Sequence, residues 1–241
     1  MLFRSPGFLI TSAINTKFGV FDSTQRFNQT LNTIESVRTK CPHAKVVLIE
    51  MAGLPLTDDQ QNILMNVTDK IISFTNDPTV KEIYKSTNWD VVKSATEMLC
   101  FGHVLNMIAE QPSYAKVDRI FKLSGRYALN DEFDFSYYEH PSILDKIVIG
   151  NHRKSQFDSK ITGNCMLQYM SRCWSFPSAY ISQMATTYEQ MLLFMLDRVK
   201  NGGYVDIEHC LYKFLPPSLV VEKSIIGVQG VLGPNGALVK D

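Results

Sequence analysis

The turn Ser124-Gly125-Arg126 is the part of this sequence best suited to hold an anionic ligand. It follows residues 119–123, a short apolar run with a polar edge that is typical of a strand. Glycine lets the backbone approach a ligand closely, and the planar guanidinium of Arg126 presents a fork of donors suited to phosphate. Open α/β sheets hold ligands beyond the carboxyl ends of their strands. The turn therefore predicts a phosphate-binding position at such an edge.

Two further predicted strands, residues 7–13 and 45–50, also end in polar side chains. Together with Arg126, these ends could form a nucleotide cleft in which the first end holds the base, Glu50 the base or ribose, and Arg126 the pyrophosphate. The residues expected at the first end are Thr11, Ser12 and Asn15. The simpler alternative is that all three ends are polar because they meet water.

The elements that must position these side chains alternate between strands and helices in the N-terminal half. We predict strands at 7–13, 45–50, 70–74 and 119–123, and helices from Asp22 or Ser23 to about 40, over 57–67, and from about Trp89 to Glu110. A strand, a helix and a strand within about forty residues form a βαβ unit, whose crossover is right-handed. This order indicates a parallel sheet with helices packed on it.

The C-terminal half has a different character and no linker, repeat or low-complexity segment precedes it. We predict strands at 143–150 and 166–171, helices from about 179 to 199 and over 206–214, and a closing hairpin of 225–231 with 237–239. The sequence therefore favours one domain over residues 1–241.

Composition excludes several classes of protein. The 241 residues carry 24 Lys and Arg against 24 Asp and Glu, so no global basic field attracts nucleic acid, and an anionic ligand must meet a local cluster. The five cysteines are scattered and never in C-x-x-C spacing, which predicts reduced thiols. No run approaches the roughly 18 apolar residues of a transmembrane segment, and the first residues do not form a signal peptide. We expect a cytoplasmic protein.

Familiar catalytic and phosphate-binding motifs are missing from the sequence. It has no G-x-G-x-x-G, no G-x-x-x-x-G-K-[ST] and no G-x-S-x-G. These absences argue against Rossmann dehydrogenases, P-loop enzymes and α/β-hydrolases.

Three stretches carry a resemblance to a known family. They are Arg26-Phe27-x-x-Thr30-Leu31-x-x-Ile34-x-Ser36-Val37, then Val47-Leu48-Ile49-Glu50, then Phe121-Lys122-Leu123-Ser124-Gly125-Arg126-Tyr127. In this order they resemble small GT-A-fold glycosyltransferases of phages and bacterial surface-polysaccharide loci. The resemblance covers nearly the whole chain, although the N-terminal two-thirds carries most of it.

The resemblance implies both a fold and an activity. The fold is an α/β domain of GT-A (nucleotide-diphospho-sugar transferase) type, with a central mixed, mainly parallel sheet flanked by helices. Residues 1 to about 135 would bind the nucleotide sugar, and about 136–241 would face the acceptor. The activity is sugar transfer from a nucleotide-sugar donor, most often a UDP-sugar such as UDP-glucose, to a glycan or surface-polysaccharide acceptor.

The family's metal-binding motif is replaced in this chain. Where the wider GT-A fold has Asp-x-Asp, this sequence has Ser-Gly-Arg-Tyr, which offers no carboxylate to Mg²⁺ or Mn²⁺. Arg126 could neutralise the leaving diphosphate directly. A carboxylate-held Mn²⁺ or Mg²⁺ stays open as the alternative, with possible ligands Asp131, Glu132, Asp134 and His209. No cofactor is certain from the sequence.

Lys93 and Glu97 lie four residues apart on the long predicted helix and therefore share one face. If this helix borders the cleft, Lys93 reaches a phosphate or a sugar hydroxyl. We assign both residues, together with Arg26, to the nucleotide-sugar site. The alternative for Lys93 and Glu97 is a solvated ion pair.

The segment Asp206-Ile207-Glu208-His209 is the best candidate for the catalytic chemistry. One carboxylate could take the proton of the acceptor hydroxyl or stabilise an oxocarbenium-like centre. His209 could bind the diphosphate or a metal. The simpler alternative is a capped helix, with Asp206 at the N-cap and Glu208 in the first turn.

Two alternatives to a glycosyltransferase remain open from the sequence. One is a catalytically weak or inactive GT-A-like protein that binds glycans or nucleotides. The other is a sugar-phosphate nucleotidyltransferase, although the first strand lacks the Gly-rich start typical of those enzymes. Trp174 and Phe176 either pack in the core or stack on acceptor sugars.

Overall fold

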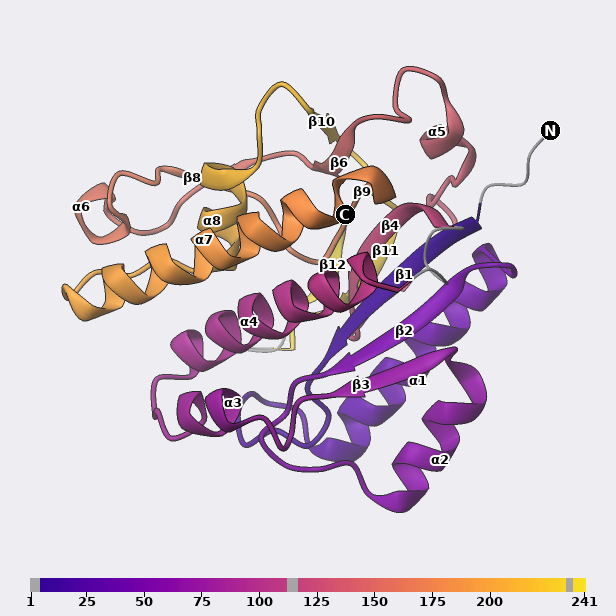
Figure 1. Cartoon of the computed structure of the whole chain (residues 1–241), viewed down its shortest axis with the longest axis horizontal. Helices are drawn as coiled ribbons and strands as arrows, with labels where there is room; N and C mark the ends of the chain where they lie inside the picture. Colours follow the sequence, from indigo (N-terminus) through magenta and orange to yellow (C-terminus); the bar gives the residue numbers. More distant parts are fainter. Residues whose placement is uncertain (1–4, 112–116, 233–235) are drawn as a thin grey trace.

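A seven-stranded sheet runs through the centre of the computed structural model, which describes residues 5–111, 117–232 and 236–241 (Figure 1). Four neighbouring strands are parallel: β4 (Val117–Ser124), β1 (Ser5–Ser12), β2 (Lys45–Glu50) and β3 (Lys70–Ser73). The sheet continues beyond β4 with β9 (Cys173–Pro177), β6 (Ile147–Gly150) and β10 (Val220–Lys223). Strand β9 is antiparallel to both neighbours, and β10 is parallel to β6. The predicted mixed, mainly parallel sheet is confirmed.

Helices cover both faces of the sheet. The longer ones are α1 (Ser23–Lys40), α2 (Asp58–Val67), α4 (Trp89–Ala109), α7 (Ile181–Lys200) and α8 (Ile207–Phe214), and the shorter ones are α3 (Pro78–Ile83), α5 (Ser136–Glu139), α6 (Ser159–Thr162) and a 3₁₀ turn, η2 (Ser178–Tyr180). Helices α1 and α2 lie on one face, and α4 and α7 lie on the other (Figure 1).

Alternation along the strands produces a separate core on each face. Leu9 and Val47 belong to the core shared with α4 and α7, whereas Phe8 and Val46 belong to the core shared with α1 and α2. Burial on both faces explains the continuous apolar runs from which these strands were predicted.

Side-chain caps begin the helices where the sequence indicated. Asp22 and Gln25 form a capping box at α1, and Thr57 and Gln60 form another at α2. In each box the N-cap side chain accepts from the N3 backbone N–H and the N3 side chain satisfies the N-cap N–H.

The C-terminal half departs further from the sequence-based expectation. Strand β9 was not predicted, and the expected strand at 166–171 is only β8 (Leu167–Gln168), paired with β7 (Arg153–Lys154). Trp174 and Phe176 lie on β9 with 1% and 0% exposure, so they are core residues and cannot stack on a sugar. The closing hairpin is confirmed as β11 (Val228–Val231) and β12 (Leu238–Lys240), extended by β5 (Tyr127–Leu129).

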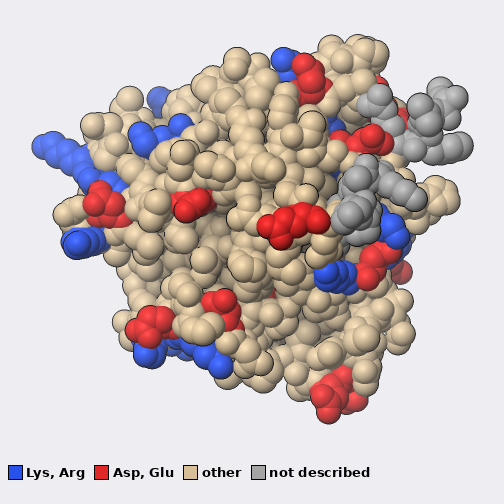
Figure 2. Space-filling model, in the orientation of Figure 1, with Lys and Arg blue, Asp and Glu red and all other residues tan. Residues whose placement is uncertain are grey.

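Basic and acidic side chains are scattered over the face shown in Figure 2, and no large patch of one sign is seen there. This matches the zero formal charge of the chain. Across the described ranges, no helix combines the length and apolar character needed to cross a membrane.

Candidate functional site

The three polar strand ends identified from the sequence lie side by side. Strand β1 sits between β4 and β2, and the register pairs Thr11 with Ser124 and Ser12 with Glu50. Because all three strands run in the same direction, their carboxyl ends share one edge of the sheet. A cleft with about 840 Å³ of empty space, its open mouth included, lies at this edge.

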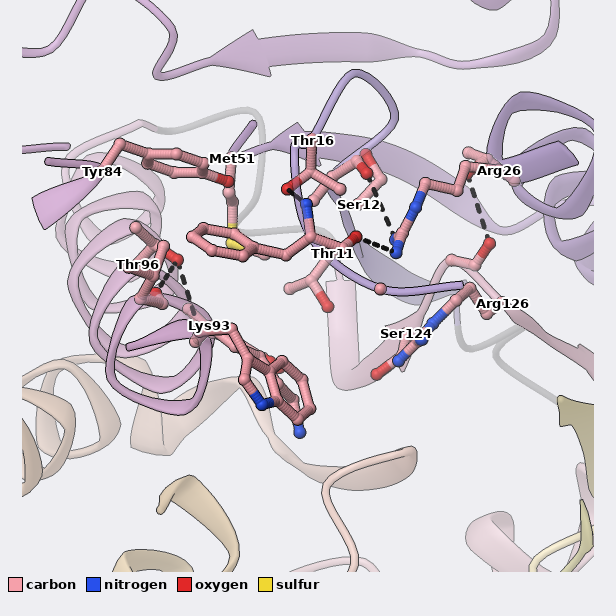
Figure 3. A pocket seen from close by; sticks show the side chains of 18 residues that line it. Thr11, Ser12, Thr16, Arg26, Met51, Tyr84, Lys93, Thr96, Ser124 and Arg126 are labelled. Carbon is pink, nitrogen blue, oxygen red and sulfur yellow. Dashed lines mark hydrogen bonds between the residues drawn. The ribbon is translucent and has the colours of Figure 1, made fainter. Parts of the chain in front are cut away.

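Most residues predicted to bind the nucleotide sugar line this cleft (Figure 3). They come from β1, the start of α1, one face of α4 and the turn after β4: Thr11, Ser12, Arg26, Lys93, Glu97 and 124–126. The sequence did not single out the aromatic residues of the same wall, Phe18, Tyr84 and Trp89. Of these three residues, Trp89 alone could have been expected from the sequence, because it lies one helical turn before Lys93 and therefore shares its helix face.

Backbone and side-chain bonds fix the turn that carries Arg126. Gly125 N donates to Thr11 O at 2.8 Å, and Thr30 Oγ1 donates to Gly125 O at 3.3 Å. A Cβ atom on Gly125 would lie 3.2 Å from both Thr11 O and Thr30 Oγ1, a tighter approach than side chains ordinarily make. Glycine is therefore present because the turn packs directly on β1 and α1.

Arg126 is half-buried, and no described residue accepts a hydrogen bond from its guanidinium. Arg26 differs, because its guanidinium donates to Phe21 O at 3.1 Å and to Phe18 O at 2.7 Å. Burial and the charge of Arg126 lower the pKa of Arg26. Arg26 thus holds the loop after β1, and Arg126 remains available to a ligand.

Lys93 adds a third cation to the cleft. Its Nζ atom lies 3.9 Å from Glu208 Oε1, and this carboxylate raises the pKa of Lys93 against the opposing effects of burial and of Arg126. Arg126 lies close enough to Arg26 and to Lys93 to act on the pKa of each, so three cations gather at this cleft in a chain without net charge. Such a site suits a diphosphate, which accepts strong charge-assisted hydrogen bonds.

Glu50 does not line the cleft. It is fully buried, and its carboxylate accepts hydrogen bonds from Ser12 Oγ at 2.6 Å, Ile14 N at 3.0 Å and Ala52 N at 3.0 Å. Because the Glu50 carboxylate is already hydrogen-bonded to these protein groups, the structure does not fit the predicted contact of Glu50 with a base or ribose. Asn15 is likewise occupied, because its Nδ2 atom donates to Pro55 O and Gln60 Oε1.

Burial raises the pKa of Glu50 above its ordinary value, although the three hydrogen bonds oppose this shift. A carboxyl with a raised folded-state pKa contributes stability below its ordinary pKa and loses that contribution as the pH rises through the folded value. Glu50→Gln can keep both N–H bonds and donate to Ser12. We therefore expect Glu50→Gln to become more stable relative to wild type as the pH rises above 4.5, the ordinary pKa of the carboxyl, with the unfolding free energy measured by urea denaturation.

Glu50→Ala provides the matched comparison for this prediction. It leaves the N–H groups of Ile14 and Ala52 without an acceptor, so it should destabilise the protein at every pH, by about 1–3 kcal/mol for each unsatisfied group. Parallel stability curves for wild type and Glu50→Gln across this pH range would contradict the assigned direction of the pKa.

A buried ion pair that the sequence did not predict lies beneath the cleft. Lys122 on β4 is fully buried, and its Nζ atom lies 2.5 Å from Glu97 Oε1. The same atom donates to Ser124 Oγ at 2.7 Å and to Ser171 O at 2.6 Å. One ammonium group therefore joins α4, the turn after β4 and the segment before β9.

In the predicted catalytic segment, Asp206 and His209 bond to each other, whereas Glu208 pairs with Lys93. Asp206 is the N-cap of α8, and it bonds His209 through N at 3.0 Å and Nδ1 at 2.6 Å. His209 is fully buried, and its Nε2 atom lies 2.8 Å from Ser155 Oγ. Burial raises the pKa of Asp206, but the hydrogen bonds and charge of His209 outweigh it and lower the pKa overall. The helix is therefore capped as the simpler alternative expected, with Asp206 at the N-cap and Glu208 in the first turn.

Glu208 is the member of this segment that approaches the cleft. Its Oε1 atom accepts from Ser171 Oγ at 2.7 Å and lies 3.9 Å from Nζ of Lys93, a residue that lines the cleft. Among the three predicted catalytic residues, Glu208 is therefore the best placed to meet a substrate.

The residues proposed as metal ligands do not come together. Asp131 pairs with Lys40 at 2.8 Å, Asp134 accepts from Ser136 Oγ at 2.6 Å, and both ring nitrogens of His209 are engaged. Within the described ranges, no group of three or more His, Cys, Asp or Glu residues could hold a metal ion. The donor set around the Arg126 turn does not fit a divalent cation.

Comparison with known proteins identifies the fold. No protein-family model and no curated protein sequence matches the chain. Core-mannan synthase A from Aspergillus fumigatus, solved in its Mn/GDP form, aligns with a TM-score of 0.50 and 10% identity over 96% of this chain and 77% of that one. A 4-diphosphocytidyl-2C-methyl-D-erythritol synthase from Anaerococcus prevotii aligns with a TM-score of 0.43 and 12% identity over 91% and 86%. Likeness to the mannan synthase and the observed sheet show the GT-A-type α/β fold.

Proposed function

We propose that this chain is a glycosyltransferase that uses a nucleotide-sugar donor, most simply a UDP-sugar such as UDP-glucose, and a glycan or surface-polysaccharide acceptor. The observation that carries the proposal is the arrangement of Arg126, Lys93 and Arg26 in one cleft at the carboxyl ends of parallel strands. The GT-A-type fold supports it. We also propose a cytoplasmic location and no nucleic-acid partner.

In this proposal the cations bind the donor diphosphate. Arg126 donates two hydrogen bonds to the diphosphate, and Lys93 adds a second positive charge from α4. Thr11 and Ser12, at the end of β1, face the nucleoside. Negative charge grows on the diphosphate as its bond to the anomeric carbon breaks, so fixed cations stabilise the transition state more than the ground state.

Glu208 is the proposed proton acceptor. As the acceptor oxygen bonds to the anomeric carbon, the bond from that carbon to the phosphate oxygen breaks and the nucleoside diphosphate leaves with the electron pair. The acceptor hydroxyl proton passes to the Glu208 carboxylate. Residues from about 136 onward, which include Glu208 and Ser171, then form the acceptor side, and residues 1 to about 135 form the donor side.

The proposed reaction does not pass through a metal ion, because the residues around the turn do not fit one. The mannan synthase was solved with Mn and GDP, so GDP-sugars and Mn²⁺ belong in any test of this chain. The positions occupied by Asp131 and Asp134 give no reason to expect that EDTA abolishes binding.

A thermal-shift screen tests the proposal. UDP-glucose, GDP-mannose and a CMP-sugar are each added with Mn²⁺ or with EDTA, and uridine serves as the control without phosphates. A ligand at about 100 times its Kd adds about 2.7 kcal/mol, which gives a clear shift. We expect stabilisation by one nucleotide class in EDTA and slow release of free nucleotide. No shift with any nucleotide would reject the donor cleft, and a shift without nucleotide release would favour a binding protein.

A further inference from the structure

The ion pair between Lys122 and Glu97 lies at the wall of the cleft. Glu97 is on the face of α4 that borders the cleft, and it lines the cleft with 8% of its side chain exposed. Ser124, which accepts a hydrogen bond from Lys122, lines the cleft as well. The pair is therefore placed where a ligand would bind.

The Lys122 ammonium donates hydrogen bonds to Ser124 Oγ and Ser171 O, and its Nζ atom forms an ion pair with Glu97 Oε1. Lys122 is fully buried among these groups, so it does not contact a ligand itself. Among the described residues, Lys122 is the one side chain within ion-pairing or hydrogen-bonding distance of Glu97. Oε1 is the carboxylate oxygen beside the lysine, and no described residue donates a hydrogen bond to it, so the Glu97 carboxylate keeps unused acceptor capacity.

Burying an ion pair is not an efficient source of stability. Desolvation of the two charges offsets their attraction. Well-packed apolar side chains of similar volume often stabilise the fold as much or more. The placement of this pair at a cleft wall therefore points to a role in ligand binding as well as in packing.

Charge decides what Glu97 can bind. An ionised carboxylate accepts hydrogen bonds and donates none, and it repels phosphate. Lys93 precedes Glu97 by one helical turn and belongs to the cationic group proposed for the diphosphate. The cleft thus has a position for anionic oxygens next to a position that rejects them and accepts hydroxyl groups.

We propose that Glu97, held in place by Lys122, recognises hydroxyl groups on the group attached to the donor diphosphate and so selects a polyhydroxylated sugar. This inference rests on the proposed function. It assigns Glu97 to the sugar, and it makes Lys122 a positioning residue.

Paired titrations test this assignment. Calorimetric affinities for UDP and UDP-glucose, and for GDP and GDP-mannose, are compared in wild type, Glu97→Gln and the control Glu82→Gln, whose exposed carboxylate pairs with Lys85 away from the cleft. We expect Glu97→Gln to weaken the nucleotide sugar about tenfold while the bare nucleoside diphosphate changes less than about twofold. Glu82→Gln should change neither.

The outcomes separate this inference from the proposed function. Equal weakening of the nucleotide sugar and the bare diphosphate, or no change in either, would overturn the sugar assignment while leaving the nucleotide cleft in place. Absence of any nucleotide binding by wild type would overturn both. If Glu97→Gln does not fold, the double variant Lys122→Met/Glu97→Gln removes both buried charges, and the same difference in affinity is expected from it.

Discussion

Replacing Arg126 by alanine is expected to weaken binding of a nucleoside diphosphate about 100-fold and leave the fold intact. A hydrogen bond to a charged group contributes about 1.5–3 kcal/mol, and the guanidinium can make two such bonds to a diphosphate. Loss of about 3 kcal/mol corresponds to about two orders of magnitude in Kd. Because no described residue accepts a hydrogen bond from this guanidinium, its removal leaves no protein group unsatisfied.

Calorimetric titration with UDP and GDP measures this effect, and Arg153→Ala serves as the matched control. Arg153 is an exposed arginine paired with Asp241, and it does not line the cleft. Arg126→Lys should bind with intermediate affinity because it keeps the charge but loses the planar fork. Equal affinities for Arg126→Ala and Arg153→Ala would show that the diphosphate is bound elsewhere.

Replacing Lys122 by methionine is expected to lower the unfolding free energy by about 3–5 kcal/mol, the usual cost of breaking a buried ion pair. The change leaves the Glu97 carboxylate in the wall without its counter-charge and removes a donor from Ser171 O and Ser124 Oγ. Urea denaturation followed by circular dichroism measures the loss. The affected groups belong to α4, β4 and the segment before β9, so the destabilisation should extend to the whole sheet.

The double variant Lys122→Met/Glu97→Gln separates the uncompensated charge from the loss of packing. Removing the second charge should restore a large part of the stability lost in Lys122→Met, because no unpaired carboxylate then remains. If Lys122→Met is as stable as wild type, the ion pair does not hold the cleft wall together. If the double variant is no more stable than the single one, lost packing rather than stranded charge is the cause.

The sheet edge could be predicted from the sequence because each strand that ends there is buried on both faces. Such strands read as continuous apolar runs, and the polar residues that follow them mark the edge. The helices between the runs require parallel strands, and parallel strands bring their carboxyl ends together. The positions of Thr11, Ser12 and the Arg126 turn followed from this reasoning.

Glu50 shows what the runs alone do not reveal. The sequence places a carboxylate at a strand end, but only the pairing of β1 with β2 sets Ser12 against Glu50. The loop after β1 then supplies the N–H of Ile14, so the Glu50 carboxylate accepts its hydrogen bonds from the protein and not from a ligand. Sheet order and register are long-range properties, so they were not available from local pattern.

Lys122 and β9 escaped prediction for related reasons. Lys122 alternates with apolar residues, as the solvated side of an edge strand does, whereas β4 lies in the middle of the sheet. Its opposite charge, Glu97, is on α4, 25 residues earlier in the chain, and is buried there. The sequence contained one indication of the buried pair: Lys122 and Glu97 carry opposite charges within two largely apolar elements. Strand β9 is short and inserted antiparallel between β4 and β6, an order that the chain sequence does not indicate.

The most direct measurement of the central claim is a crystal structure of the protein grown with UDP or GDP in the presence of EDTA. We predict the diphosphate at the carboxyl ends of β1 and β4, with its oxygens about 2.7–2.9 Å from the guanidinium nitrogens of Arg126, and with Lys93 beside it. A diphosphate bound away from this guanidinium, or one that occupies the cleft only when a metal ion held by carboxylates is present, would contradict the account.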